Sequence, residues 1–240
     1  MLKIINKIPY SSLMTYLRQF NFVFRSLVAR EPQLKLFYLP YILWDCKKFK
    51  SFKQNPSERM ISSDTELVID GFQGSANSFA AFVFQKSQTK YVRIAHHLHS
   101  PAQIIEAARK NIPILLVIRE PEKAVLSLTS RWPYISIQQG LESYISFYSK
   151  LEPYAANCIV STFEQTTGYF DRVVQRINIR FGTKFDVVDM AQANQWKPPQ
   201  GERKKLKKQK KQDFKLESNN YLLEKANELY IKFKILAKQD

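Results

Sequence analysis

The three histidines of the chain, His96, His97 and His99, lie within four residues of one another, directly after a short and mostly apolar run at 91–95 that contains Arg93. An imidazole has a pKa near neutrality, so it can accept and return a proton at physiological pH. The apolar run predicts a buried strand, and ligands of open α/β sheets bind at the carboxyl ends of strands. We therefore expect proton transfer at a ligand site, with a set of hydrogen-bonded structural histidines as the alternative.

A second stretch, residues 65–88, predicts an anion-binding loop between a strand and a helix. The apolar run 67–69 is typical of a central parallel strand, and helical spacing begins about ten residues later. Between them, Gly71 and Gly74 permit backbone geometry that a Cβ would forbid. The N–H groups and the dipole of the following helix N-terminus favour a phosphate or a sulfate. The short polar side chains at this N-terminus are Ser75, Asn77 and Ser78.

This loop does not match the Walker A pattern of nucleotide hydrolases. That pattern ends in Gly-Lys-[Ser/Thr], whereas Ala76, Asn77 and Ser78 occupy those places here. The mismatch argues against an ATP or GTP hydrolase. A glycine-containing turn that binds nothing remains the alternative for the stretch alone, because such turns occur in most α/β proteins.

A second anion site is predicted after the apolar run 113–118. Arg119 follows this run directly, and Ser127 comes eight residues later on a helix that begins near Pro121. A guanidinium can bind a phosphate through two parallel hydrogen bonds, and a hydroxyl can add a third. An ion pair between Arg119 and a neighbouring glutamate at the surface is the alternative.

The elements that must position these side chains alternate along the chain. Strands at 67–69, 91–95, 113–118 and 158–160 are followed by helices, which predicts an α/β fold: a parallel sheet with helices on both faces. Ser100 is expected to cap the helix after the histidines, and Ser136 to cap a helix over 136–152. Further helices are expected over 168–181 and from about 219.

One domain with terminal additions is predicted: a basic helical extension at 1–60 that packs on the core, and an α/β domain at 61–240 with the basic segment 201–215 and a carboxyl-terminal helix. Residues 10–30 form an amphipathic pattern whose apolar stripe is expected to face the core. Neither this segment nor the run 36–44 is long and apolar enough to cross a bilayer. A peripheral membrane contact is a further possibility for the extension. The stripe consists of Leu13, Leu17, Phe20, Phe24 and Leu27.

The formal charge of +16 is concentrated outside the central region. Residues 1–60 hold 11 basic and 3 acidic side chains, residues 61–200 hold 14 and 12, and residues 201–215 hold 8 and 2. The flanks could attract nucleic acid, an anionic membrane surface or an anionic ligand. Nucleic acid is the less favoured partner, since no helix-turn-helix signal, zinc spacing or RNA-binding aromatic pair is present.

The cysteine pattern favours a reducing compartment. Cys46 and Cys158 lie far apart, with no CxxC spacing and no secretory signal, so we expect a cytoplasmic protein, with a peripheral membrane location as the alternative. No metal-ligand cluster is predicted.

Taken together, these motifs resemble the sulfotransferases that use 3′-phosphoadenosine 5′-phosphosulfate (PAPS). Residues 74–78, GSANS, stand in the place of that family's [Lys/Arg]-Ser-Gly-Thr-Thr loop. Arg119 and Ser127 keep the spacing of its second element, and His97, followed by Leu98, lies 22 residues before Arg119, as in its Thr-His-Leu-Pro-like segment. The resemblance covers roughly residues 65–182 and, more weakly, 198–236. It implies a P-loop NTPase-like sulfotransferase fold.

The resemblance also implies roles for individual residues. His97 would be the catalytic base, and the acceptor would be a hydroxyl, preferably of a glycan or a glycolipid. Arg119 and Ser127 would hold the 3′-phosphate of PAPS, with no metal. The basic run, with Arg203 and Lys204, is similar to the carboxyl-terminal part of bacterial and glycan-directed members and would contribute to cofactor binding. The loop that holds the 5′-phosphosulfate would consist of Gly74, Ser75, Ala76, Asn77, Ser78 and Phe79.

One departure from the family pattern concerns catalysis. Gly74 stands where family members carry a Lys or Arg that touches the transferring group. Loss of such a preorganised cation typically costs several kcal/mol of transition-state stabilisation. Lys123, Arg131 or the run 203–211 could replace it. If none of them does, the protein would bind PAPS or its product adenosine 3′,5′-bisphosphate (PAP) without turnover.

Overall fold

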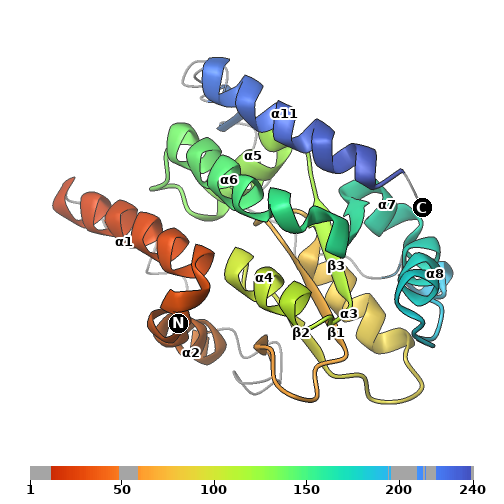
Figure 1. Ribbon diagram of the computed structural model, residues 1–240. Coiled ribbons are helices and arrows are strands. Elements are labelled where there is room, and N and C mark those ends of the chain that lie inside the picture. Colours follow the sequence, from red (N-terminus) through yellow and green to blue (C-terminus); the bar gives the residue numbers. More distant parts are fainter. Residues whose placement is uncertain are drawn as a thin grey trace.

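The structure, a computed structural model, describes residues 12–48, 59–193, 195, 210–212, 214 and 220–238. Its centre is a sheet of four parallel strands in the order β2-β1-β3-β4 (Figure 1). The predicted α/β class with a parallel sheet is therefore confirmed. The strands are β1 Leu67–Gly71, β2 Ile94–His96, β3 Ile114–Ile118 and β4 Ile159–Thr162.

Helices cover both faces of this sheet because the strands are apolar on both sides. Val68, Leu116 and Val160 point to one face and pack with α4, α5, α6 and α11. Ile69 and Leu115 point to the other face and pack with α3 and α8. The helices are α3 Asn77–Ser87, α4 Pro101–Arg109, α5 Pro121–Arg131, α6 Ile137–Leu151, α7 Phe163–Gly168, α8 Phe170–Phe181, α9 Met190–Ala193 and α11 Asn220–Leu236, with 3-10 turns at Pro32–Leu34 and Glu152–Asn157.

Local signals set the starts of several helices as predicted. The Ser136 hydroxyl accepts from Gln139 N, and the Gln139 side chain binds back to Ser136 N, which makes a capping box at the start of α6. Ser100 caps α4 by accepting from Gln103 N. Two predictions differ: the second strand covers Ile94–His96 instead of 91–95, and the short helix α7 was not predicted.

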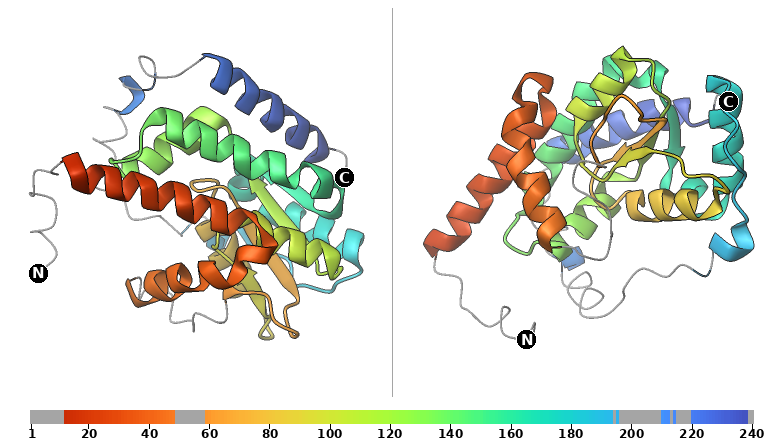
Figure 2. Two further views of the ribbon diagram at one scale, coloured as in Figure 1. Left: turned by 60° about the vertical axis from the view of Figure 1, so that its left-hand side comes forward. Right: turned by 90° about the horizontal axis from the view of Figure 1, so that it is seen from below.

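The predicted orientation of the amino-terminal helix is wrong. Helix α1, Ser12–Arg30, does pack beside α4 and α6 (Figures 1 and 2), but its apolar stripe points away from them. The side chain of Gln19 donates to Tyr134 O at 2.9 Å, and Arg30 Nη1 donates to Ser146 Oγ at 3.0 Å. The surface of α6 and of the loop before it is thus polar at these contacts, so the polar side of α1 packs against it. The stripe residues are exposed by 66% (Leu13), 52% (Leu17), 69% (Phe20), 40% (Phe24) and 43% (Leu27).

A small separate core joins the amino-terminal helices to the segment that carries the histidines. Val28 and Ala29 of α1 pack with Tyr38 and Ile42 of α2, Lys35–Lys48, and with Leu98. Among the residues that the structure describes, no helix is long and apolar enough to cross a membrane. Most of the basic run lies outside the described residues, including the predicted cofactor ligands Arg203 and Lys204.

Candidate functional site

The carboxyl edge of the sheet contains a point where the strand order reverses. From β1 the chain continues to β2 on one side and then to β3 on the other, so the loops after β1 and β3 diverge between these two neighbours. Crevices for ligands form at such points in open α/β sheets. The loop that contains Gly74 follows β1, and Arg119 follows β3, so both predicted anion-binding elements lie at this position.

Gly74 packs directly against α5 and requires the absence of a side chain. Its φ is +85°, and a Cβ at this position would lie 2.7 Å from Ser127 Cβ and 2.8 Å from Ser127 Oγ. Arg119 Nη1 donates to Gly74 O at 2.7 Å. The structure therefore brings Gly74, Arg119 and Ser127 together, although they lie up to 53 positions apart in the chain.

Arg119 is held by the protein on several sides. Its guanidinium lies 3.8 Å from the centre of the Phe163 ring, and its carbonyl accepts from the Tyr144 hydroxyl at 2.8 Å. Burial lowers the pKa of Arg119 from its ordinary value, while Glu164 and Glu120 act in the opposite direction. Its Nε is buried without a hydrogen-bond partner among the described residues. The nearby Glu120 forms its ion pair with Lys123 instead, at 2.6 Å.

Helix α3 begins without a side-chain cap. Its N-cap residue is Ala76, with φ 78° in the left-handed region. The Asn77 amide donates to the carbonyls of Gly71 and Phe72, both at 3.0 Å, and so holds the loop closed. Ser75 is fully buried and donates its N–H to Phe72 O at 3.2 Å. The first N–H groups of a helix have no partner within it, so this uncapped end can bind an anion.

A cavity of about 350 Å³ opens over this helix end. It brings together the loop after β1, the helices α5 and α7, and one histidine. Of the predicted loop residues, only Ser75 does not line it. Phe163 and Thr167 of α7 were missed, although Thr162 and Gln165 form a capping box whose sequence pattern could have predicted this helix. The lining residues are Gly74, Ala76, Asn77, Ser78, Phe79, His99, Ser127, Arg131, Phe163 and Thr167.

The histidine segment adopts an unusual backbone. His97 and His99 have φ values of 60° and 51°, a region that costs free energy for residues other than glycine. The amino-terminal helices hold the segment in place. The Tyr38 hydroxyl donates to Leu98 O at 2.5 Å, and Ser100 Oγ donates to Ala29 O at 2.6 Å. The two positive φ angles decide which imidazole reaches the cavity.

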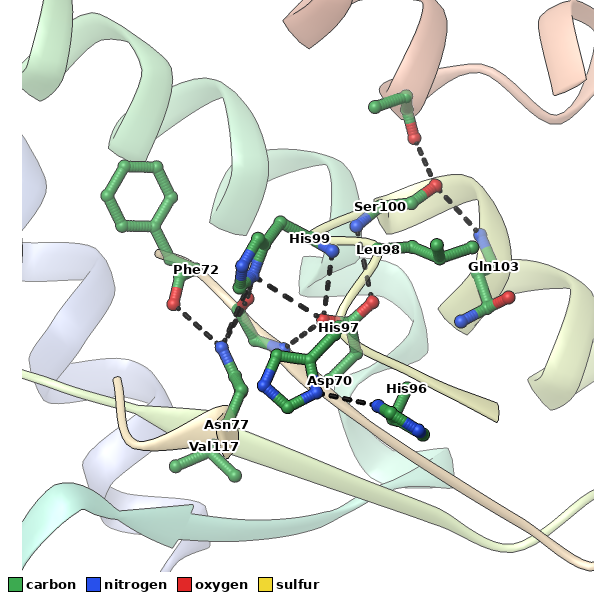
Figure 3. A network of polar contacts seen from close by, with 12 residues as sticks. Asp70, Phe72, Asn77, His96, His97, Leu98, His99, Ser100, Gln103 and Val117 are labelled. Atoms are coloured by element: carbon green, nitrogen blue, oxygen red, sulfur yellow. Dashed lines mark hydrogen bonds and ion pairs between the residues drawn. The ribbon is translucent and has the colours of Figure 1, made fainter. Parts of the chain in front are cut away.

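Asp70 ties the histidine segment to β1 (Figure 3). Its carboxylate is fully buried and accepts from Gly71 N at 2.9 Å, from His99 N at 3.0 Å and from Ser100 N at 3.3 Å. Burial nevertheless raises the pKa of Asp70 to about 7, because removal from water disfavours the charged form. Asp70 therefore titrates near neutral pH.

His99 is the histidine that lines the cavity, and its neutral ring has one unprotonated nitrogen. Its Nδ1 lies 2.8 Å from Gly71 O, and a carbonyl oxygen only accepts, so Nδ1 carries the proton of the neutral ring and Nε2 does not. Burial lowers the pKa of His99 to about 3, and the charges of Arg131, Arg25 and Arg59 act in the same direction. The ring also borders a second, small cavity of about 30 Å³ beneath α1.

His97, the predicted base, lies behind Ser78 and does not line the cavity. Its Nε2 is 2.7 Å from Ser78 Oγ, and its Nδ1 is 2.6 Å from Nδ1 of the buried His96. The dashed line in Figure 3 marks this contact between the two rings. Burial lowers the pKa of His97 well below its usual value and that of His96 to about 3. Both nitrogens of His97 thus have partners within the protein.

The histidines do not form a metal site. No group of three or more His, Cys, Asp or Glu side chains is arranged to hold a metal ion in the part of the chain that the structure describes.

No family model matches the chain, and neither a curated protein nor a solved structure matches it.

Proposed function

We propose that the protein transfers a sulfuryl group from PAPS to a hydroxyl of an acceptor, for which a glycan or a glycolipid is the first choice. The observation that carries this proposal is the cavity at the β1/β3 crevice. The uncapped N-terminus of α3, Arg131, Ser127 and the neutral His99 line it together, whereas Arg119 is not among its lining residues. Its volume of about 350 Å³ falls within the range of small-ligand sites.

The conformation of Ala76 supports the alignment of the loop with the sulfotransferase pattern. Ala76 stands where [Lys/Arg]-Ser-Gly-Thr-Thr has its glycine, and its φ of 78° is a conformation that glycine adopts without strain. A residue that keeps this conformation without being glycine is consistent with a backbone shaped for a ligand. In this alignment, the N–H groups at the start of α3 and the Ser78 hydroxyl bind the 5′-phosphate.

The 3′-phosphate is assigned to Arg119 and Ser127. Both residues lie against Gly74, next to the proposed 5′-phosphate site. A guanidinium has five N–H donors, and the buried Nε of Arg119 has no partner among the described residues. An anion would supply the missing acceptor after a shift of the side chain, because Nε is buried and Arg119 does not line the cavity.

Of Lys123 and Arg131, the two single candidates that the structure describes, Arg131 is the better replacement for the cation that the loop lacks. It lines the cavity, whereas Lys123 is paired with Glu120 and does not. A lysine could not be restored at position 74, since even a Cβ there would collide with Ser127. Arg131 would therefore balance the negative charge that builds up on the leaving phosphate.

We assign the catalytic base to His99. The acceptor hydroxyl would give its proton to Nε2 while its oxygen forms the new bond to sulfur. The bond from sulfur to the 5′-phosphate oxygen breaks at the same time, and PAP leaves with that electron pair. The charge of the bound donor would raise the low pKa of His99, so the base becomes effective when PAPS is present. His97 would position Ser78.

The test is transfer of labelled sulfate from PAPS to a panel of glycans, glycolipids and simple alcohols. We expect His99→Ala to reduce the rate about 10²- to 10⁴-fold, the range for loss of a general base. His97→Ala should have a clearly smaller effect. If only His97→Ala abolished transfer, His97 would be the base; no transfer by the wild-type protein to any acceptor would contradict the proposed activity.

Binding of PAPS without turnover is the second candidate function, and the absence of a cation at Gly74 favours it. Calorimetry with PAP separates the two, because this reading predicts tight binding with no transfer to any acceptor. A third reading, nucleic-acid binding through the basic flanks, predicts an affinity that falls steeply with salt but persists at physiological salt.

A further inference from the structure

The outward side of α1 forms an apolar stripe that nothing covers within the described residues. Its large side chains recur every three or four positions, so they share one side of the helix. Each is exposed by between 40% and 69%. We call this set the outer stripe; it comprises Leu13, Tyr16, Leu17, Phe20, Val23, Phe24 and Leu27.

The outer stripe does not contribute to folding as an ordinary surface helix does. Such a helix buries its apolar side against the core and exposes its polar side. In α1 the polar residues Ser26 and Arg30 contact α6, and Gln19 contacts the loop before it. Phe22 is a large apolar residue of α1 that is buried. Contiguous exposed apolar surface of this kind marks an interaction site.

The neighbouring helix α2 also exposes large apolar side chains. Leu36 and Phe37 at its start are 81% and 62% exposed. Two adjoining helices that both expose large apolar side chains offer a broad surface for a partner. A groove that accepts one side chain would need a much smaller exposed apolar surface.

The charge of the amino-terminal segment selects the kind of partner. Residues 1–60 hold 11 basic and 3 acidic side chains. A second copy of the chain would bring two such basic segments together, and their repulsion opposes that contact. An anionic bilayer instead complements the charge and accepts aromatic and aliphatic side chains at its boundary.

We propose that α1 is an interfacial helix that binds an anionic lipid bilayer, with the outer stripe inserted at the boundary between headgroups and acyl chains. Basic side chains of residues 1–60 would contact the lipid headgroups. Helix α1 has 19 residues, and no helix of the described residues could span a membrane, so the binding is peripheral. This proposal does not depend on the proposed enzymatic activity.

The test uses the full-length protein and sedimentation with large vesicles of phosphatidylcholine, with or without about 30% phosphatidylserine. The variant Leu17→Ser/Phe20→Ser/Phe24→Ser removes the centre of the outer stripe. The matched control Ile179→Ser/Ile231→Ser/Ile235→Ser changes three side chains elsewhere that are 84%, 55% and 52% exposed. Circular dichroism confirms that each variant is folded.

We expect the wild-type protein and the control to sediment with the anionic vesicles and much less with neutral ones. The outer-stripe variant should bind at least about tenfold more weakly, since insertion depends on buried apolar area. Wild-type protein that remains in solution with anionic vesicles would overturn the proposal, as would a variant that binds equally well. A dimer that only the outer-stripe variant dissociates, without vesicle binding, would identify the stripe as a contact between copies and would also overturn it.

Discussion

The carboxyl edge of the sheet and the outer side of α1 both reverse the usual arrangement of a folded protein. At the sheet edge, Asp70, Asn77 and His96 are polar and buried; on α1, Leu17 and Phe20 are apolar and exposed. Burial of polar groups costs free energy of folding, and exposure of apolar groups forgoes the stabilisation that their burial would give. The two regions differ in how far the protein itself offsets that cost.

At the sheet edge, hydrogen bonds compensate for burial. Asp70 accepts from three backbone N–H groups, and Asn77 donates to two carbonyls. Such a network is rigid, so it holds the cavity in one shape before a ligand arrives. On α1 no contact within the described residues compensates for exposure. The sheet edge thus satisfies many of its polar groups within the chain, although Asn77 Oδ1 and Arg119 Nε are buried without a hydrogen-bond partner among the described residues. The apolar stripe of α1 is left exposed within the same residues.

The largest expected effect concerns the histidines at low pH. Burial lowers the pKa values of His96 and His99 to about 3, so both remain neutral in the folded protein while they are protonated in the unfolded chain below about pH 6.5. Their contribution to stability is fully present above that pH and is lost as the pH falls toward 3. A shift from 6.5 to about 3 corresponds to about 5 kcal/mol per histidine over the whole range. Urea titrations between pH 7 and 4 measure this loss; stability that does not fall would contradict neutral buried histidines.

The ionisation of Asp70 should change the free energy of unfolding with pH in the opposite direction. Its folded pKa of about 7 lies above the unfolded value of 3.8, so its contribution is fully present below pH 3.8 and is lost as the pH rises through 7. The difference corresponds to about 4 kcal/mol. Asp70→Asn cannot ionise and should remove this pH dependence, although it also loses an acceptor for Ser100 N. Urea titrations of both proteins from pH 5 to 8 compare the slopes, and equal slopes would show that Asp70 does not titrate there.

A smaller effect is expected from a methyl group at Gly74. Gly74→Ala combines a strained positive φ with a contact of 2.7 Å to Ser127 Cβ, so it should cost about 2–4 kcal/mol of the free energy of unfolding. Gly182→Ala is the matched control, because its φ is +67° but no atom lies within 4 Å of the added Cβ. The control should cost only about 1 kcal/mol. Similar losses in both variants would remove the packing argument for the loop.

The smallest effect should come from the outer stripe. Phe20→Ser changes a side chain that is 69% exposed, so the free energy of unfolding should change by less than about 0.5 kcal/mol in the absence of lipid. Leu141→Ala on α6 removes a fully buried side chain and should cost about 2–5 kcal/mol. Thermal unfolding of the two variants compares them directly. A large loss for Phe20→Ser would mean that the stripe is covered within the chain.

The sequence could predict those elements that residues close together in the chain determine. The apolar run of β3 and the Ser136 cap of α6 are local signals, and both gave correct elements. The direction of the α1 stripe could not be predicted, since periodicity shows which residues share a side but not which side meets the core. That choice depends on polar groups of α6 such as Ser146, more than 100 residues away.

The site was predictable to a similar degree. Spacing brought Gly74, Arg119 and Ser127 together correctly, because the carboxyl ends of adjacent parallel strands meet. The spacing of the motifs could not show which of His97 and His99 lines the cavity. That choice rests on two left-handed backbone angles, which hydrogen bonds from distant residues such as Tyr38 help to maintain.

Calorimetric titration with PAP tests the central claim that the cavity at the β1/β3 crevice binds this nucleotide. We expect one site per chain. Ser127→Ala and Arg119→Ala should each weaken PAP binding by about 1.5–3 kcal/mol, the range for hydrogen bonds to charged groups. Adenosine 5′-phosphosulfate lacks the 3′-phosphate, so it should bind weakly to the wild-type protein and be nearly unaffected by either change. No binding of PAP, or an equal loss for both ligands, would contradict the account.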